Sequence, residues 1–162
     1  MGLKKSDLAD LPESANDWYA HLFYISRKKC LIFTHAKTLF TFIAMNVPRE
    51  NIRMINEVFR MGLERTLLLE GFTSQDIDKI LASVSDIVFA KTINRAVIGS
   101  MNDLIFQYLS MIEYNLPNGS MDMSRIMKEM NRIPMSYIDN YAIEKFKEHY
   151  SITSASIPPN YQ

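Results

Sequence analysis

The stretch from Trp18 to Met45, WYAHLFYISRKKCLIFTHAKTLFTFIAM, constrains the fold more than any other part of this chain. It is rich in β-branched and aromatic residues, which favour strands. Two polar clusters, Ser26–Lys29 and His35–Thr38, interrupt it and indicate turns. The stretch therefore predicts a three-stranded β-meander.

We expect the first loop at Arg27-Lys28, which would pair Ile25 with Cys30. We expect the second at Ala36-Lys37, which would pair Thr34 with Leu39. Side chains alternate between the two faces of a strand. The first predicted face carries His21, Phe23, Ile25, Cys30, Ile32, Leu39, Thr41 and Ile43, and the second carries Trp18, Leu22, Tyr24, Leu31, Phe33, Phe40 and Phe42. Because both faces are largely apolar, we expect cover on both sides, by helices or by a second subunit.

Composition narrows the class of protein. A chain of 162 residues with 48% hydrophobic and 22% charged residues is typical of a globular protein with a real core. The formal net charge is zero, which removes the global electrostatic argument for nucleic acid or an anionic membrane, although a local patch could still bind. One cysteine excludes an internal disulfide framework. With no apolar run typical of a signal peptide or a membrane span, we expect a cytoplasmic protein.

The rest of the chain is mostly helical in pattern. Apolar residues at helical spacing predict five helices that begin near Pro48, Thr73, Asn94, Ser120 and Asn140. Residues 86–91 contain Ile-Val-Phe and predict one more strand, which we expect to join the meander's sheet. The sequence therefore predicts an α+β fold, with an antiparallel sheet of about four strands and about five helices packed on it.

The sequence predicts a structural role for two glycines. Gly62 lies within the apolar stripe of the first predicted helix, which indicates close approach to the sheet or to another helix. Gly71 lies where a glycine commonly ends a helix.

The ends of the chain differ from its middle. Residues 1–16 are polar, and residues 151–162 include the pair Pro158-Pro159. We expect a flexible N-terminal segment at 1–16, a single α+β domain at 17–150 and a flexible C-terminal tail at 151–162.

Catalytic and metal-binding motifs are absent from the sequence. It contains no H-E-x-x-H, C-x-x-C or G-x-S-x-G pattern and no glycine-rich phosphate loop. In the predicted register His21 and Cys30 share a face without being cross-strand partners, and a cysteine on an apolar strand usually belongs to the core. The sequence therefore predicts no catalytic residue, no metal site and no cofactor.

Two short basic segments are candidate anion-binding sites. Arg27 and Lys28, followed by Lys29, could hold a phosphate or a nucleic-acid backbone, or could form a solvated turn. Asn94 and Arg95 lie at a predicted helix N-terminus, where free N–H groups favour an anion. Asn94 could equally be an ordinary helix cap.

The two basic segments could also form one site. If the strand predicted at 86–91 runs parallel to Trp18–Ile25, its exit lies beside the basic turn, and Arg27 and Arg95 could hold one phosphate-like group. If the two strands are antiparallel, Arg27 and Arg95 lie apart.

The order W-x-x-x-L-F-x-I-x-R-K-K-C, followed later by T-I-N-R-A-V-I-G-S-M-N, resembles an uncharacterised bacterial family of domains of unknown function. The matching positions are Trp18, Arg27, Lys28, Thr92, Arg95, Gly99, Met101 and Asn102. Ala96 stands where relatives often carry serine, which weakens any role for a hydroxyl group there. The resemblance covers roughly residues 18–146, and it implies a bacterial cytoplasmic domain without naming a reaction.

Two functions follow as hypotheses. The first is a non-enzymatic interaction module that binds a protein partner, a second copy of itself or nucleic acid. The second is a small-molecule or nucleotide-handling enzyme with an anion site at Asn94 and Arg95. A deep pocket beside Arg95 would favour the enzyme.

Overall fold

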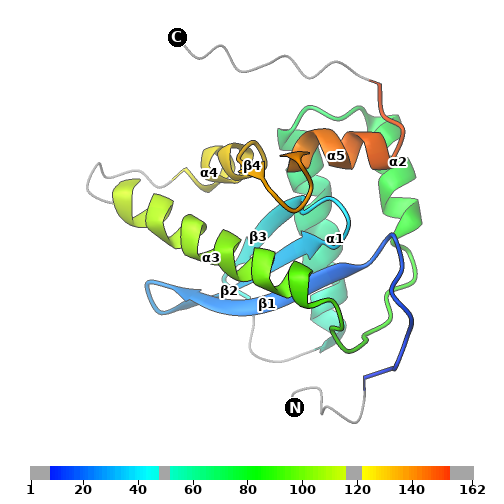
Figure 1. The fold of residues 1–162 in the computed structure, drawn as a ribbon, viewed down its shortest axis with the longest axis horizontal. Helices are drawn as coiled ribbons and strands as arrows, with labels where there is room; N and C mark the ends of the chain where they lie inside the picture. The colour runs from blue at the N-terminus through cyan, green and yellow to red at the C-terminus, as the bar shows by residue number, and fades with distance from the viewer. Residues whose placement is uncertain (1–7, 48–51, 116–121, 154–162) are drawn as a thin grey trace.

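The computed structural model describes residues 8–47, 52–115 and 122–153 (Figure 1). Strands β1 (Trp18–Ile25), β2 (Lys28–His35) and β3 (Thr41–Met45) form an antiparallel sheet in the order β1-β2-β3. The described helices are α1 (Ile52–Leu69), α2 (Ser74–Ser83), α3 (Arg95–Asn115), α4 (Met123–Met130) and α5 (Ala142–His149). Strands β4 (Pro134–Met135) and β5 (Asn140–Tyr141) form a small second sheet between α4 and α5.

The α+β class is confirmed, but the prediction of a fourth strand in the meander's sheet is wrong. Residues 86–91 form only a single parallel bridge, between Ala90 and Ala9, outside the main sheet. Val88, at the centre of the predicted strand, is 65% exposed, and Ile87 and Phe89 on either side of it are only half-buried. The additional strand pair is instead the β4–β5 hairpin.

The predicted pairing of the meander is shifted by two residues at both turns. Ile25 pairs with Lys28 and Thr34 pairs with Thr41. The first turn consists of Ser26 and Arg27, whose φ angles of 46° and 67° match a two-residue type I′ turn. Because both shifts are even, every side chain keeps its predicted face.

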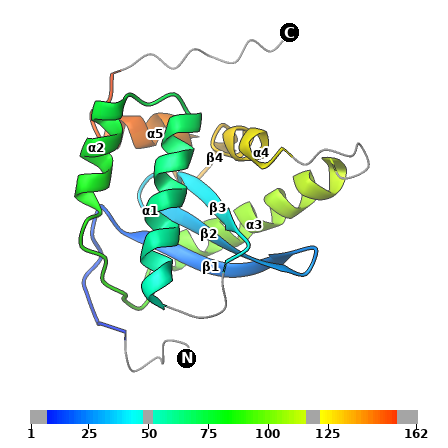
Figure 2. The same cartoon turned by 180° about the vertical axis from the view of Figure 1, so that it is seen from behind.

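The sheet lies between helices on its two faces. Helix α3 covers the face that carries Phe23, Cys30 and Ile32, in front of the sheet in Figure 1. Helix α1 covers the opposite face, where the Phe33 ring lies 5.2 Å from that of Phe59 (Figure 2). The expected two-sided cover is therefore present over β2 and β3.

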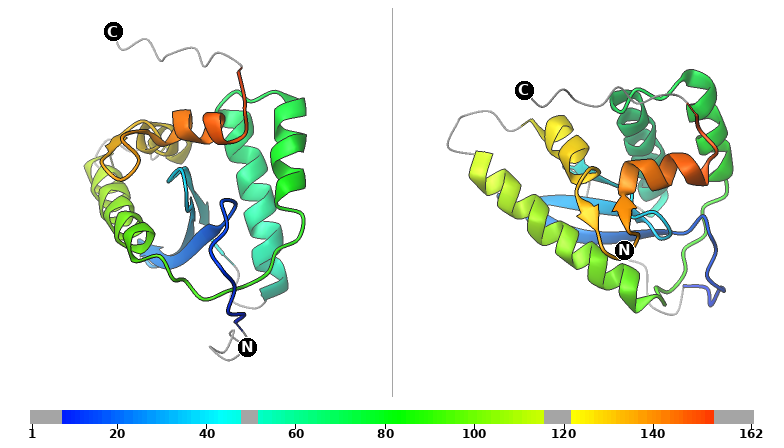
Figure 3. Two further views of the ribbon diagram at one scale, coloured as in Figure 1. Left: turned by 45° about the vertical axis from the view of Figure 1, so that its right-hand side comes forward. Right: turned by 45° about the horizontal axis from the view of Figure 1, so that its top comes forward.

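Helix α5 lies across the end of the sheet where β2 turns into β3 (Figure 3). The Phe146 ring stacks on Phe40, with 4.2 Å between the ring centroids, and both residues are fully buried. Ile143 of the same helix is buried as well.

Both glycine expectations are confirmed. A Cβ atom on Gly62 would lie 2.7 Å from the buried Phe42 ring, so the absence of a side chain lets α1 contact the sheet closely. Gly71 follows α1 with φ at 83°, in the left-handed region that favours glycine.

The described parts of the two predicted flexible segments are residues 8–16 and 151–153, and the remainder lies outside the described residues. Residues 8–16 run beside the segment that leads into α3. The Ala9 N–H donates to the carbonyl of Phe89, and the Lys91 N–H donates to the carbonyl of Ala9.

Candidate interaction surface

The N-terminus of α3 is built as a capped helix end. The Asn94 side-chain oxygen accepts hydrogen bonds from the N–H groups of Ala96 and Val97, at 3.0 and 3.2 Å. Its amide group donates to the Glu13 carboxylate at 2.8 Å. The expected cap is therefore present, and it places a carboxylate beside the position predicted for an anion.

Lys91 and Arg95 differ in their surroundings. The Lys91 ammonium group forms an ion pair with Asp10 at 2.9 Å, so its charge is already partnered. Arg95, the first residue of α3, is exposed and makes no hydrogen bond or ion pair with the residues that the structure describes. Of these two basic residues, Arg95 is thus the one whose charge has no partner among the described residues.

The two basic segments lie at opposite ends of β1. The Asn94 N–H donates to the Tyr19 hydroxyl group at 3.0 Å, which fixes the start of α3 near the start of the strand. Arg27 lies in the turn after Ile25, and the seven residues from Tyr19 to Ile25 span about 20 Å of extended chain. A single phosphate-like group is too small to bridge that distance. The condition for a joint site, a parallel strand at 86–91 in this sheet, is not met.

A polar cluster is buried where β2 ends. The His35 Nδ1 atom lies 2.9 Å from the Thr38 hydroxyl oxygen, and its ring packs edge-on against Trp18 with 5.1 Å between centroids. Burial, with smaller contributions from the nearby charges of His149 and Lys37, lowers the pKa of His35 to about 3. His35 is therefore a neutral, fully buried ring at neutral pH, and sequence reasoning assigned it no role beyond a turn.

The side chains that could act as nucleophiles or metal ligands are dispersed. Cys30 is fully buried, and burial raises the pKa of its thiol, while His21 on the same strand pair is exposed and lies opposite Ile32. Within the described ranges, no group of three or more His, Cys, Asp or Glu side chains could hold a metal ion. A hollow of about 510 Å³ lies on the β4–β5 hairpin, lined by Pro134, Met135, Ser136, Asp139, Asn140 and Tyr141. It is far in the sequence from Arg95 and contains one carboxylate.

The outer edge of β3 is closed by α4, and we call it the closed edge. The Thr41 N–H donates to the Asn131 side-chain oxygen at 2.9 Å, and the Asn131 amide donates to the Thr41 carbonyl at 2.8 Å. The Ile43 N–H donates to the Met127 sulfur at 3.4 Å. These contacts satisfy the outward-facing N–H groups of Thr41 and Ile43 and the Thr41 carbonyl with side chains rather than with another strand.

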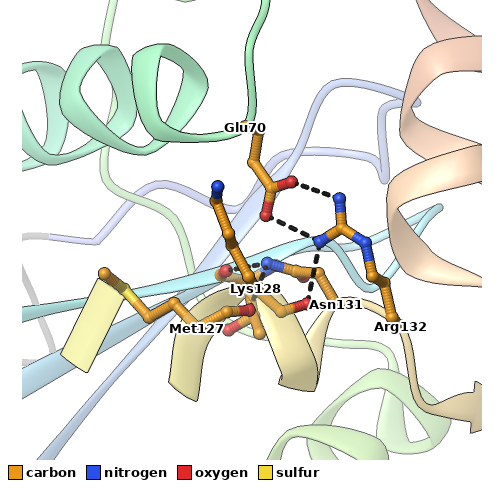
Figure 4. Close-up of polar contacts among 6 residues, drawn as sticks. Glu70, Met127, Lys128, Asn131 and Arg132 are labelled. Atoms are coloured by element: carbon orange, nitrogen blue, oxygen red, sulfur yellow. Dashed lines mark hydrogen bonds and ion pairs between the residues drawn. The ribbon is translucent and has the colours of Figure 1, made fainter. Parts of the chain in front are cut away.

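A buried ion pair fixes α4 in this position (Figure 4). Arg132, directly after Asn131, makes a two-pronged contact with Glu70 through hydrogen bonds of 3.2 and 2.7 Å, and also donates to the Lys128 carbonyl. The Glu70 side chain is only 1% exposed. Paired, planar contacts of this kind are directional, so they orient the end of α4 toward the sheet.

The outer edge of β1 has no such cover, and we call it the open edge. In the two-residue hairpin Ile25 bonds to Lys28, so the N–H and C=O groups of alternate residues face β2 and those between them face outward. The outward-facing groups belong to Trp18, Ala20, Leu22 and Tyr24, and these backbone groups have no hydrogen-bond partner within the described part of the chain. Leu22 and Tyr24 are also 45% and 55% exposed, because α1 does not reach them.

One flank of α3 adds apolar surface beside the open edge. The Asn115 side-chain oxygen accepts a hydrogen bond from Arg125, so the C-terminal end of α3 lies beside the start of α4. Helix α3 also contacts β1, and its residues Ile98, Ile105 and Leu109 lie on one flank, roughly a quarter of a turn from its buried stripe, with Leu109 37% exposed. The views in Figures 1 and 3 agree that α3 crosses the sheet with α4 beyond its other flank.

No helix among the described residues is long and apolar enough to cross a membrane. A sequence model of a protein family, described as "Domain of unknown function (DUF6933)", matches residues 1–144. No curated protein matches the chain.

Proposed function

The chain belongs to the DUF6933 family of domains of unknown function, and we propose that it is a non-enzymatic interaction module that binds a protein partner at the open edge of β1. The observation that carries the proposal is the row of outward-facing backbone groups at Ala20, Leu22 and Tyr24. An extended segment of a partner can add to such an edge as one more strand. Main-chain hydrogen bonds then supply affinity, and alternate side chains supply specificity.

The composition of β1 supports this proposal. Soluble proteins commonly protect a free strand edge with lysine, proline, a β-bulge or a very short strand. Strand β1 is eight residues long, contains no charged residue and no proline, and pairs with β2 without a bulge. An exposed strand of this kind is suited to pairing with another strand, and its exposed Leu22 and Tyr24 side chains offer apolar contact.

Selection of peptides tests this function. Extended peptides selected from a random library on the immobilised chain are expected to bind the open edge, and to lose binding when single backbone N–H groups are methylated. Leu22→Lys should abolish their binding. Leu68→Lys is the matched control, because Leu68 is 59% exposed on α1 and lies away from the edge. Peptides whose binding is indifferent to Leu22→Lys would overturn the proposal.

The alternative is an enzyme that handles a small molecule or a nucleotide, with an anion held by Asn94 and Arg95. Its support is the free guanidinium group of Arg95 at the start of α3. Glu13 opposes it, because its carboxylate is hydrogen-bonded to Asn94 and repels an anion there. If inorganic phosphate raises the unfolding temperature and Arg95→Ala removes that increase, an anion site exists. An unchanged unfolding temperature would exclude it. The basic turn at Arg27 and Lys28 is tested in the same assay with Arg27→Asn.

A further inference from the structure

We propose that the partner at the open edge is a second copy of this chain, with the two β1 strands paired antiparallel about a two-fold axis at Leu22. This inference rests on the proposed function of the open edge and names its occupant. The two sheets would join into one sheet of six strands.

The hydrogen-bonding pattern of β1 suits this register. An axis at Leu22 places the residue opposite its own copy, and places Ala20 opposite Tyr24 of the second chain. All three residues have outward-facing N–H and C=O groups, so each forms a hydrogen-bonded pair in the antiparallel ladder. The register therefore satisfies every outward-facing group from Ala20 to Tyr24 without a bulge.

The side chains fit the same register. On the face that α1 leaves open, the small Ala20 lies opposite the large Tyr24, and the two Leu22 side chains meet at the axis. On the other face His21 lies opposite Phe23. Because β1 carries no charged side chain, the pairing places no like charges opposite one another.

Charges at the two ends of β1 are complementary in this arrangement. Asp17 immediately precedes the strand, and its carbonyl accepts a hydrogen bond from the Ala36 N–H, so it continues the extended chain. Arg27 lies in the turn at the other end, where it makes no ion pair with the described residues. A two-fold axis at Leu22 brings Asp17 of each chain to Arg27 of the other. This complementarity points to a second copy rather than to an unrelated peptide, and the zero net charge adds no overall repulsion.

The apolar flank of α3 supports the same occupant. In an antiparallel pair the two-fold axis is perpendicular to the sheet, so both α3 helices lie on the same face of the joined sheet. Helix α3 contacts β1, and its flank carries Ile105 and the partly exposed Leu109. The pairing would therefore cover apolar surface that the single chain leaves exposed.

Cysteine cross-linking of the full chain tests the register. Opposed residues in a hydrogen-bonded pair have Cα atoms about 5.5 Å apart, within the range of a disulfide. Leu22→Cys should therefore form a disulfide-linked dimer under mild oxidation. Ala20→Cys alone and Tyr24→Cys alone should each form no disulfide between chains, because equivalent residues of the two copies are about 13 Å apart. A mixture of the two variants should form the disulfide, because Ala20 lies opposite Tyr24. Leu68→Cys controls for random collision, and the native Cys30 is fully buried. Equal cross-linking of Leu22→Cys and Leu68→Cys, or no cross-linking at either, would overturn the inference.

A charge exchange tests the partner assignment. Arg27→Asp suits the left-handed turn, because aspartate tolerates positive φ, and it should weaken self-association in analytical ultracentrifugation roughly tenfold by losing two exposed ion pairs. Asp17→Arg should weaken it similarly. A mixture of the two variants should associate like the wild-type chain, because each then meets an opposite charge. Circular dichroism checks that both variants are folded.

The two proposals fail in different ways. A chain that stays monomeric in ultracentrifugation, yet binds selected peptides that Leu22→Lys removes, would overturn the self-pairing and leave the interaction module standing. A chain that shows neither self-association nor edge-dependent peptide binding would overturn both. A mixture of Arg27→Asp and Asp17→Arg that associates no better than either variant alone would exclude the two-fold register.

Discussion

The two edges of the sheet differ in how their outward-facing backbone N–H and C=O groups are satisfied. At the closed edge, Asn131 satisfies the outward-facing N–H and C=O groups of Thr41, and Met127 of α4 satisfies the N–H group of Ile43. At the open edge, the equivalent groups of β1 are left to solvent or to another strand. A strand edge that is closed from within contributes to stability, whereas an edge left open keeps backbone groups that can pair with another strand.

The largest expected effect is on the pH dependence of stability. It concerns His35, whose buried ring packs against Trp18 at the start of β1, the strand with the open edge. The pKa of His35 is about 3, against 6.5 for an ordinary histidine. Below pH 6.5 the unfolded chain binds a proton that the folded chain does not. The free energy of unfolding should therefore fall by about 1.4 kcal/mol per pH unit until pH 3, roughly 4 kcal/mol in all.

Urea denaturation of the wild-type chain and of His35→Asn at a series of pH values measures this effect. Asparagine can replace the contact to Thr38 without titrating. The carboxylates contribute equally to both proteins, so the difference between their pH slopes belongs to His35. Identical slopes would show that the packed start of β1 does not depend on a neutral ring.

The second prediction breaks the closed edge. Asn131→Ala removes the partners of the buried Thr41 N–H and C=O groups, and it should lower the free energy of unfolding by about 2–4 kcal/mol. The midpoint of urea denaturation measures the loss. Asn115→Ala is the control, because the Asn115 amide bonds only to Met111 within its own helix and its oxygen bonds to the exposed Arg125. A loss at Asn131 no larger than that at Asn115 would contradict the role of the closed edge.

The third prediction concerns the packing of α1, which covers β3 and contacts Trp18 at the start of β1 but leaves Leu22 and Tyr24 exposed. A methyl group at Gly62 would lie 2.7 Å from the fully buried Phe42 ring. Overpacking of a core costs about 1–3 kcal/mol and should outweigh the roughly 1 kcal/mol gain in helix propensity. Gly62→Ala should therefore lower the melting temperature.

Gly99→Ala is the matched control in this case. No atom lies within 4 Å of a Cβ at Gly99, so the same substitution in α3 should raise the melting temperature through helix propensity alone. A stabilising Gly62→Ala would mean that α1 can move away from the sheet, which would remove the contrast between the covered and uncovered strands.

The smallest expected effect is at the open edge. Leu22→Thr keeps strand propensity and removes little buried surface, because Leu22 is 45% exposed. At dilutions where the chain is monomeric, its free energy of unfolding should change by less than about 0.5 kcal/mol. A loss comparable to that of Asn131→Ala would show that the open edge is structural in the single chain.

The sequence predicted the faces of the meander but not its pairing. Alternation of apolar residues determines which face each side chain takes, and a shift of two residues leaves that unchanged. The pairing depends on the turn, and Ser26-Arg27 lacks the Asn-Gly or Asp-Gly pair that marks a type I′ turn. Caps with a local signal were predictable, and Thr73 and Asn94 both accept hydrogen bonds from the first turns of their helices.

Contacts between distant residues could not be predicted from one sequence. Asn131 is one of many polar residues after position 115, and no local pattern connects it with Thr41, ninety residues earlier. The contact of His35 with His149 also joins segments that the sequence keeps far apart. The open edge could not be predicted for a related reason, because the sequence predicts a strand at 86–91 that would join the sheet and cover β1.

The ninety-residue separation between Thr41 and Asn131 has a consequence for how the protein is made. The meander needs only neighbouring contacts, so it can form as soon as its strands leave the ribosome, whereas α4 must still be synthesised. At about 5–20 residues per second, the 86 residues from Met45 to Asn131 take roughly 4–17 seconds. During that interval both sides of the nascent sheet can pair with other chains, and we expect a ribosome-bound fragment ending before α4 to need a chaperone that the finished domain does not.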